Sequence, residues 1–127
     1  MPLRDRDLKG LAIIVAGEDR ARFHAALSLA GAQAALGGRS RVYLHGPAVG
    51  LLAAAAIDRE DALWRAAGQP TVAQLQEDAL TLGVTLIACQ TGLAMAGIDA
   101  ATLDARIETG GLVGLMATLD EDRLLFA

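Results

Sequence analysis

The 127-residue sequence contains a single cysteine, Cys89. One thiol cannot form a disulfide within its own chain, supply the several thiolates of a structural zinc site, or run a Cys-x-x-Cys redox cycle. The two histidines, His24 and His45, are far apart in the sequence, so their spacing predicts no metal site. Any chemistry at Cys89 therefore involves this sulfur alone or the sulfur of a second molecule.

Aromatic residues are also scarce, at 3% of a chain that is 54% hydrophobic. The core must therefore consist mainly of Leu, Ala, Val and Ile, and alanine removes comparatively little apolar area from water. The length predicts one domain, residues 1–127. Because the chain is small and apolar, we expect part of its surface to lie in a homo-oligomer interface.

The sequence lacks both a basic excess and a long apolar run. The formal net charge is −4 and the arginines are dispersed, which argues against direct nucleic-acid binding. The apolar run at residues 48–57 is far shorter than the roughly 20 residues of a membrane-spanning helix. Residues 1–10 carry charges of both signs and no signal-type apolar core follows them. The sequence thus predicts a cytoplasmic protein with no membrane span.

Strands and helices are expected to alternate in the first part of the chain. Residues 10–17 predict a buried parallel strand, residues 18–38 a helix, and residues 39–46 a second strand. This order predicts a right-handed strand–helix–strand unit in a parallel sheet. The core face of the helix is expected to contain Phe23, Leu27, Ala30, Ala34 and Leu36.

Helical segments are expected between the second and third strands. Residues 47–57 predict a short apolar helix, and residues 58–70 a charged, irregular, partly helical segment. Residues 71–83 predict a helix whose capping box is formed by Thr71 and Gln74.

The remainder of the chain is expected to complete an α/β sandwich. Residues 84–89 predict a third strand, residues 92–96 one helical turn, and residues 100–107 a short helix. Residues 110–119 fit helix or strand by periodicity. Helix is favoured, because residues 123–127 predict a closing strand.

Cys89 ends the predicted third strand and is followed by the small-residue sequence QTGLAMAG. Parallel α/β folds keep their chemistry at the carboxyl ends of strands, and N–H groups at a helix start favour a thiolate. The backbone amides of Gln90, Thr91 and Gly92 are therefore candidate substrate-binding groups, and the glycine would let a substrate approach the backbone closely. Alternatively, Cys89 is an inert, buried small hydrophobe.

The histidines and the acidic cluster are weaker candidates. His45 ends the second strand at the same sheet edge as Cys89, where it could act as a base, a thiolate partner or a supporting donor. The alternative is a histidine bonded to nearby backbone. We expect His24 at the surface or in an interface. The cluster at residues 58–61 is expected to be a solvated turn rather than an acid–base pair.

Other features predict packing rather than chemistry. The turn VAGEDRAR lacks both the G-x-G-x-x-G pattern and the Walker lysine, so nucleotide binding is not expected there. Met95 and Met116 are expected to fill the core. Trp64 and Tyr43 are expected to be packing anchors.

Three stretches together resemble the DsrE/DsrF-like family of small sulfur-relay domains, which includes the Tus proteins and relatives called peroxiredoxin family proteins. They are LAIIVAGEDRARFHAALSLAGAQAALGG, RVYLHGPAVGLL and, most specifically, GVTLIACQTGLAMAGID. A true peroxiredoxin's threonine-x-x-cysteine motif is absent, so no peroxidase activity is implied.

The resemblance implies a single-domain, three-layer Rossmann-like α/β sandwich with a mostly parallel sheet of about five strands. It also implies a homotrimer or homohexamer, no metal or nucleotide cofactor, and partners that donate and accept sulfur. Cys89 would be the cysteine that carries a persulfide. Some members of the family lack this cysteine and serve as structural subunits.

Three functional hypotheses remain open from the sequence. The first is a persulfide carrier or sulfurtransferase that uses Cys89. The second is a non-catalytic assembly module with an inert cysteine. The third is a redox sensor that oxidises Cys89 to a sulfenic acid or an intermolecular disulfide.

Overall fold

Five parallel strands form one sheet in the computed structural model, which describes residues 8–53 and 59–127. The order across the sheet is β4-β3-β2-β1-β5, and all four neighbouring pairs run parallel. The strands are β1 (Leu11–Ala16), β2 (Ser40–His45), β3 (Thr85–Cys89), β4 (Glu108–Gly110) and β5 (Arg123–Phe126). This architecture confirms the predicted Rossmann-like α/β sandwich.

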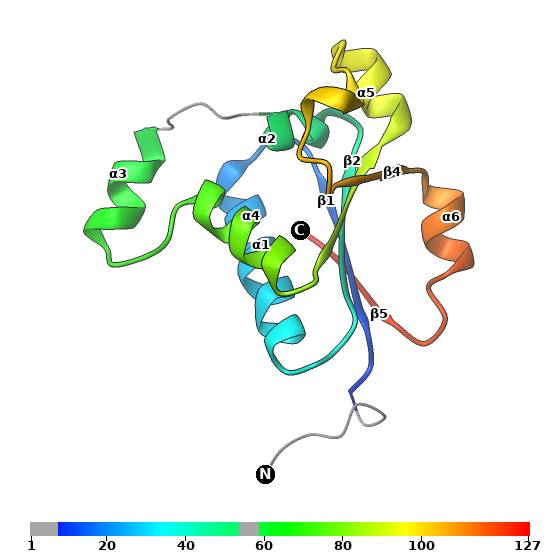
Figure 1. Cartoon of the computed structure of the whole chain (residues 1–127), viewed down its shortest axis with the longest axis horizontal. Coiled ribbons are helices and arrows are strands. Elements are labelled where there is room, and N and C mark those ends of the chain that lie inside the picture. The colour runs from blue at the N-terminus through cyan, green and yellow to red at the C-terminus, as the bar shows by residue number, and fades with distance from the viewer. Residues whose placement is uncertain (1–7, 54–58) are drawn as a thin grey trace.

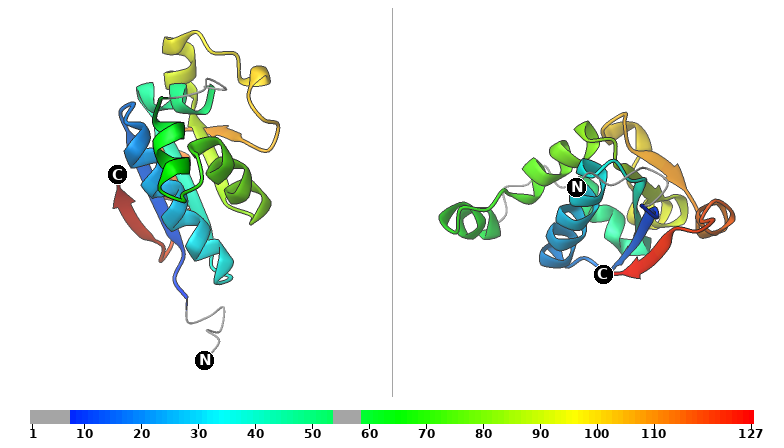
Figure 2. Two further views of the ribbon diagram at one scale, coloured as in Figure 1. Left: turned by 90° about the vertical axis from the view of Figure 1, so that its left-hand side faces the viewer. Right: turned by 90° about the horizontal axis from the view of Figure 1, so that it is seen from below.

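Helices cover the two faces of the sheet unequally. The longest, α1 (Arg20–Ala35), packs against α4 (Val72–Thr81) on one face, while the short α6 (Leu112–Ala117) lies on the other (Figures 1 and 2). The connections contain η2 (Gly46–Val49), α2 (Gly50–Ala53), α3 (Arg59–Ala66), α5 (Gln90–Ala96) and η3 (Ala100–Thr102). No helix in the described ranges combines the length and hydropathy that a membrane crossing requires.

Side chains of β2 alternate between the two faces, as those of any strand do. Val42 and Leu44 are fully buried, and α1 packs against β2. The guanidinium of Arg41 bonds Thr118, the residue that follows α6, with 2.7 Å from Nη1 to Oγ1. Tyr43 and His45 therefore also lie on the α6 face, since they follow Arg41 at intervals of two residues.

Local capping explains where the two main helices begin. The Asp19 carboxylate accepts hydrogen bonds from the backbone N–H groups of Ala21 and Arg22, at 2.9 and 3.1 Å, and so starts α1. At α4, the Thr71 N–H donates to Gln74 Oε1 at 2.8 Å and the Gln74 N–H donates to Thr71 Oγ1 at 3.2 Å. The predicted capping box is therefore confirmed.

The region after α5 differs from the prediction. The helix expected over residues 100–107 is only the single turn η3, because Arg106 bonds back to Asp104 and across to Glu77 of α4. The strand β4 was not expected at all. The helix expected over residues 110–119 forms only as α6.

The segment between β2 and α4 is more broken than predicted. The apolar helix expected over residues 47–57 is divided into η2 and α2, and its last residues fall outside the described ranges. Asp58, the first residue of the predicted solvated turn, also lies outside them. Glu60 and Asp61 are in the first turn of α3, and Asp61 is buried rather than solvated.

Burial corrects several side-chain predictions. Leu36, Met95 and Met116 are exposed rather than in the core. His24 is buried rather than at the surface: its ring stacks on Trp64 with centroids 3.6 Å apart, and its Nε2 donates to the Pro70 carbonyl oxygen at 2.9 Å. Trp64 is thus the packing anchor that the sequence predicted, and it connects α3 to α1.

Candidate functional site

Cys89 is both the last residue of β3 and the N-cap of α5. Its Sγ accepts a hydrogen bond from the Gly92 N–H at 3.3 Å, in the place where a serine or aspartate oxygen usually caps a helix. The residue is 6% exposed and not in a disulfide. The sulfur is therefore held by backbone geometry at the carboxyl edge of the sheet.

The small residue at position 92 has a steric explanation. A Cβ built there would overlap the Gly46 carbonyl oxygen, so the first turn of α5 lies directly against the loop that follows β2. Gly46 itself adopts φ +53°, in the left-handed region that favours glycine. The backbone of Gly46 occupies the direction that a side chain at position 92 would take, while Gly92 itself lines the cavity described below. That Gly92 admits a substrate to the backbone stays a prediction.

Tyr43, from the neighbouring strand β2, completes the surroundings of the sulfur. Tyr43 is 1% exposed, lines the same cavity as Cys89, and its hydroxyl interacts electrostatically with the Cys89 thiol. Burial raises the pKa of the Tyr43 hydroxyl well above its ordinary value, and the hydrogen bond and charge of Cys89 raise this pKa further. The hydroxyl thus remains protonated and able to donate.

Opposing effects act on the Cys89 thiol. Burial raises its pKa, whereas hydrogen bonds from Tyr43 and from the backbone N–H groups of Gly46, Gly92 and Thr91 lower it. The hydrogen bonds prevail, and the pKa of Cys89 is lowered from its ordinary value. The environment therefore favours the nucleophilic thiolate.

The sulfur faces a cavity of about 530 Å³. Residues at the ends of β2 and β3, the first residues of α5 and α6, and Gly110 and Gly111 line it. Gly110 pairs with Cys89 in the sheet register, so no side chain fills the space beside the sulfur. The cavity is lined by Tyr43, His45, Gly46, Pro47, Cys89, Gln90, Thr91, Gly92, Met95, Gly110, Gly111, Leu112 and Val113. None of these lining residues is an arginine, lysine, aspartate or glutamate.

The structure brings all the sequence-predicted site residues to this one cavity. Cys89, His45, Gln90, Thr91 and Gly92 are all part of its lining. Within the described ranges, no hydrogen bond joins His45 to Cys89. The His45 ring instead lies beside the Tyr43 ring, with centroids 6.2 Å apart.

Tyr43 is the residue whose site position the sequence analysis missed. It was predicted to be a packing anchor, and its burial agrees with that prediction. Its position two residues before His45 was the available signal, because alternate residues of a strand share a face.

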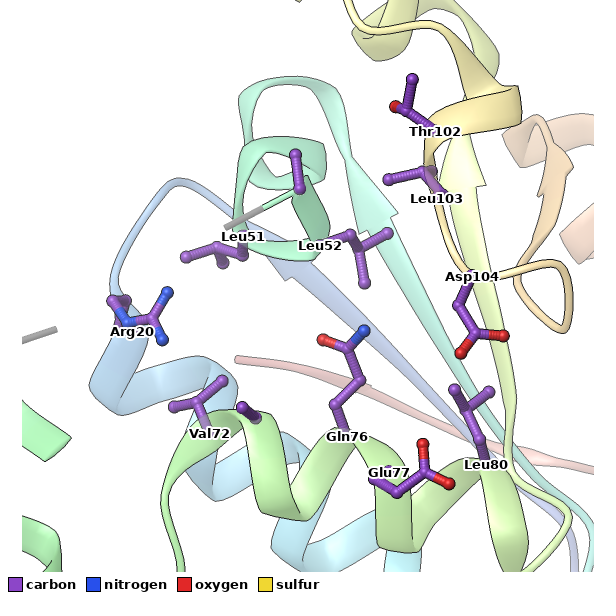
Figure 3. A pocket seen from close by; sticks show the side chains of 12 residues that line it. Arg20, Leu51, Leu52, Val72, Gln76, Glu77, Leu80, Thr102, Leu103 and Asp104 are labelled. Atoms are coloured by element: carbon purple, nitrogen blue, oxygen red, sulfur yellow. The ribbon is translucent and has the colours of Figure 1, made fainter. Parts of the chain in front are cut away.

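A second cavity, of about 360 Å³, lies on the other side of the sheet (Figure 3). Side chains of α2 and α4, including Leu52 and Gln76, point into it, and Asp104 lies at its border. Arg106 connects two of the lining residues, Glu77 and Asp104, with Nη2–oxygen distances of 2.6 and 2.7 Å. This cavity contains none of the sequence-predicted site residues.

Neither cavity has the side chains of a metal centre. Throughout residues 8–53 and 59–127, no three histidine, cysteine, aspartate or glutamate side chains are grouped as metal ligands. The chemistry that the larger cavity can support is therefore that of a thiolate surrounded by neutral hydrogen-bond donors and apolar walls.

No family model matches this sequence, and no curated protein matches it. Several solved structures have the same fold. The YchN protein of E. coli superposes with a TM-score of 0.71 at 21% identity, over 94% of this chain and 99% of that chain. The protein of unknown function MTH1491 from Methanobacterium thermoautotrophicum gives 0.66 at 17% identity, over 94% and 99%. The conserved protein of unknown function BT1422 from Bacteroides thetaiotaomicron gives 0.62 at 18% identity, over 91% and 94%. These similarities show a shared fold, and that fold fits the DsrE/DsrF-like resemblance of the sequence.

Proposed function

We propose that the protein is a sulfur carrier that holds a persulfide on Cys89 and passes its outer sulfur to an acceptor thiol. The observation that carries the proposal is the Cys89 sulfur at the start of α5. It faces a cavity and accepts a hydrogen bond from the Gly92 N–H at 3.3 Å. The resemblance of the sequence to DsrE/DsrF-like sulfur-relay domains supports the same function.

The proposed loading step is a thiol exchange. The Cys89 thiolate attacks the outer sulfur of a donor persulfide R–S–SH, a new S–S bond forms to Cys89, and the donor S–S bond breaks. The electron pair leaves on the donor as R–S⁻, so no oxidant or reductant is needed. Delivery to an acceptor thiolate is the same reaction with Cys89 as the leaving group.

We also propose that the protein works as a homo-oligomer, a trimer or hexamer, in the cytoplasm, and receives and delivers sulfur through protein partners. Large apolar side chains are exposed on the α6 side of the sheet and on α5, namely Met95, Leu112, Val113, Met116 and Phe126. Apolar exposure of this kind is typical of an interface. The family resemblance suggests the trimer or hexamer.

The test is the intact mass of the protein after incubation with glutathione persulfide, with and without a thiol reductant. We expect native protein to gain one sulfur atom that the reductant removes, and Cys89→Ser to gain none. Sulfur loading that survives in Cys89→Ser would overturn the proposal. So would a native protein that gains no sulfur and resists alkylation, which would favour the assembly module with an inert cysteine.

A mass gain that reductant does not reverse would instead indicate oxidation to a sulfinic acid. Disulfide-linked dimers that form with peroxide, in the absence of sulfur loading, would favour the redox sensor. Both outcomes would count against the sulfur carrier.

A further inference from the structure

We propose that Tyr43 is a catalytic residue of sulfur transfer, whose hydroxyl donates a hydrogen bond to the Cys89 sulfur when that sulfur becomes the leaving group. This inference rests on the proposed function and assigns a chemical role to a side chain that the sequence identified only as a packing anchor.

The strand register positions the two side chains. Tyr43 pairs with Ile87 in the parallel β2–β3 ladder, and Cys89 follows Ile87 by two residues, so all three side chains lie on one face of the sheet. Both Tyr43 and Cys89 line the 530 Å³ cavity. A buried tyrosine hydroxyl normally finds a hydrogen-bond partner. The Tyr43 hydroxyl and the Cys89 thiol affect each other's pKa, so the sulfur is the partner that we assign to it.

The direction of the hydrogen bond follows from the two ionisation states. Burial keeps the Tyr43 hydroxyl neutral, because it raises the pKa of that group beyond the range in which the Cys89 thiol ionises. A thiolate can only accept, and a neutral phenol can donate. Tyr43 therefore donates to the anionic sulfur, and a charge-assisted bond of this kind is stronger than a neutral one.

Delivery of sulfur produces a negative charge on Cys89 Sγ, and the Tyr43 hydroxyl would stabilise this charge. The acceptor thiolate A–S⁻ attacks the outer sulfur of Cys89–S–SH, the A–S bond forms, and the S–S bond to Cys89 breaks. The electron pair passes to Cys89 Sγ, which leaves as a thiolate. A leaving thiol of lower pKa leaves faster but attacks more slowly, so Tyr43 assists delivery more than it assists loading.

Replacement of Tyr43 by phenylalanine keeps the ring and removes only the hydroxyl. Loss of one hydrogen bond to a charged group is expected to raise the pKa of Cys89 by about one unit, and so to lower the thiolate fraction at neutral pH roughly tenfold. Well above the pKa, where both proteins are fully ionised, the variant should react at least as fast as native protein, because its thiolate is the stronger nucleophile.

The experiment measures the rate of Cys89 alkylation by iodoacetamide as a function of pH in native protein and in Tyr43→Phe. Folding of both is checked by circular dichroism. We expect the midpoint of the alkylation profile of Tyr43→Phe to lie at higher pH than that of native protein. Below this midpoint the variant should be alkylated more slowly, and at high pH, where both thiols are ionised, its rate should be no lower. An unchanged midpoint would overturn the role of Tyr43. An equal loss of rate at every pH would also overturn it, because that pattern indicates altered access.

A second substitution strengthens the hydroxyl at position 43 as a hydrogen-bond donor instead of removing it. Tyr43 is the only tyrosine of the chain, so biosynthetic incorporation of fluorotyrosine alters this position alone. Its more acidic hydroxyl is a stronger donor, and we expect the midpoint to move to lower pH. The fluorotyrosine-containing protein also tests the inference if Tyr43→Phe does not fold. An unchanged alkylation midpoint in the fluorotyrosine protein would contradict the role of Tyr43.

The alkylation profile and the mass experiment separate the two proposals. A shifted profile without sulfur loading would overturn the sulfur carrier. Reductant-sensitive loading of native protein without any shift in the variants would overturn the role of Tyr43 alone.

Discussion

Gly92 and Gly46 lie so close that a Cβ on Gly92 would overlap the carbonyl oxygen of Gly46. This contact holds the first turn of α5 against the loop after β2, and those two segments carry Cys89 and His45. The geometry of the sulfur site therefore depends on the absence of a side chain at position 92.

Gly92→Ala is expected to force these two segments apart. We expect it to lower the free energy of unfolding by about 1–3 kcal/mol, as overpacking does. It should also raise the pKa of Cys89, because the Gly92 N–H moves away from the sulfur. Urea unfolding and the alkylation profile measure the two effects.

Gly114→Ala in α6 is the matched control, since its Cβ would meet no atom within 4 Å. There we expect stabilisation of about 0.5–1 kcal/mol, because alanine is favoured over glycine inside a helix. Equal effects of the two substitutions would contradict the steric account of Gly92.

The ionisation of Cys89 gives a second prediction. Hydrogen bonds lower its pKa in spite of burial, so the alkylation midpoint of native protein should fall below that of an unperturbed thiol. The unfolded state keeps the ordinary pKa. The contribution of Cys89 to stability is therefore fully present above the unfolded pKa and is lost as pH falls through the folded pKa. Urea unfolding of native protein and Cys89→Ser across this interval should show that difference, and a midpoint above the ordinary value would contradict it.

The charge of the cavity predicts which sulfur donors react. Its lining contains no arginine or lysine to hold a sulfonate, and the Cys89 thiolate itself repels a dianion. We expect glutathione persulfide to load Cys89 and thiosulfate to load it at least tenfold more slowly, a difference of about 1.4 kcal/mol in activation free energy. Intact-mass time courses with the two donors measure the ratio. Equal rates would show that the site holds sulfonates by other groups.

The exposed apolar surface predicts the effect of a charge on assembly. Phe126 on β5 is 73% exposed, and Leu63 on α3 is 69% exposed. If the α6 side of the sheet is the subunit interface, Phe126→Asp should reduce the molar mass measured by light scattering, because a carboxylate is costly to bury. Leu63→Asp, on the helix that stands apart from the sheet, should leave it unchanged (Figure 1). A monomeric native protein would contradict the proposed oligomer.

The sequence predicted the framework because periodicity and caps are local signals. The strands that end at His45 and Cys89 were recognisable from their apolar runs, and Thr71 with Gln74 form the expected capping box. These residues already place the two candidate side chains at one edge of the sheet.

The sequence could not predict features that depend on distant partners. The three-residue strand β4 exists because it pairs with β3, and its own residues, Glu108–Gly110, carry no strong strand signal. The sequence predicted only that Tyr43 packs in the core, and its burial agrees with that prediction. Its interaction with Cys89 joins residues far apart in the chain, so no local pattern could indicate it. His24 is buried against two distant partners, the stacked ring of Trp64 and the carbonyl of Pro70.

Cys89 unites two roles that proteins usually keep apart, since the atom that would carry cargo also caps α5. Whatever is attached to Sγ changes the acceptor that the Gly92 N–H meets, and thereby the stability of the first helical turn. By thermodynamic reciprocity, whatever orders or loosens that turn must alter the affinity of the sulfur for its cargo to the same extent. The amide proton of Gly92 is consequently a built-in reporter, whose NMR shift and exchange rate would follow the occupancy of the carrier in real time.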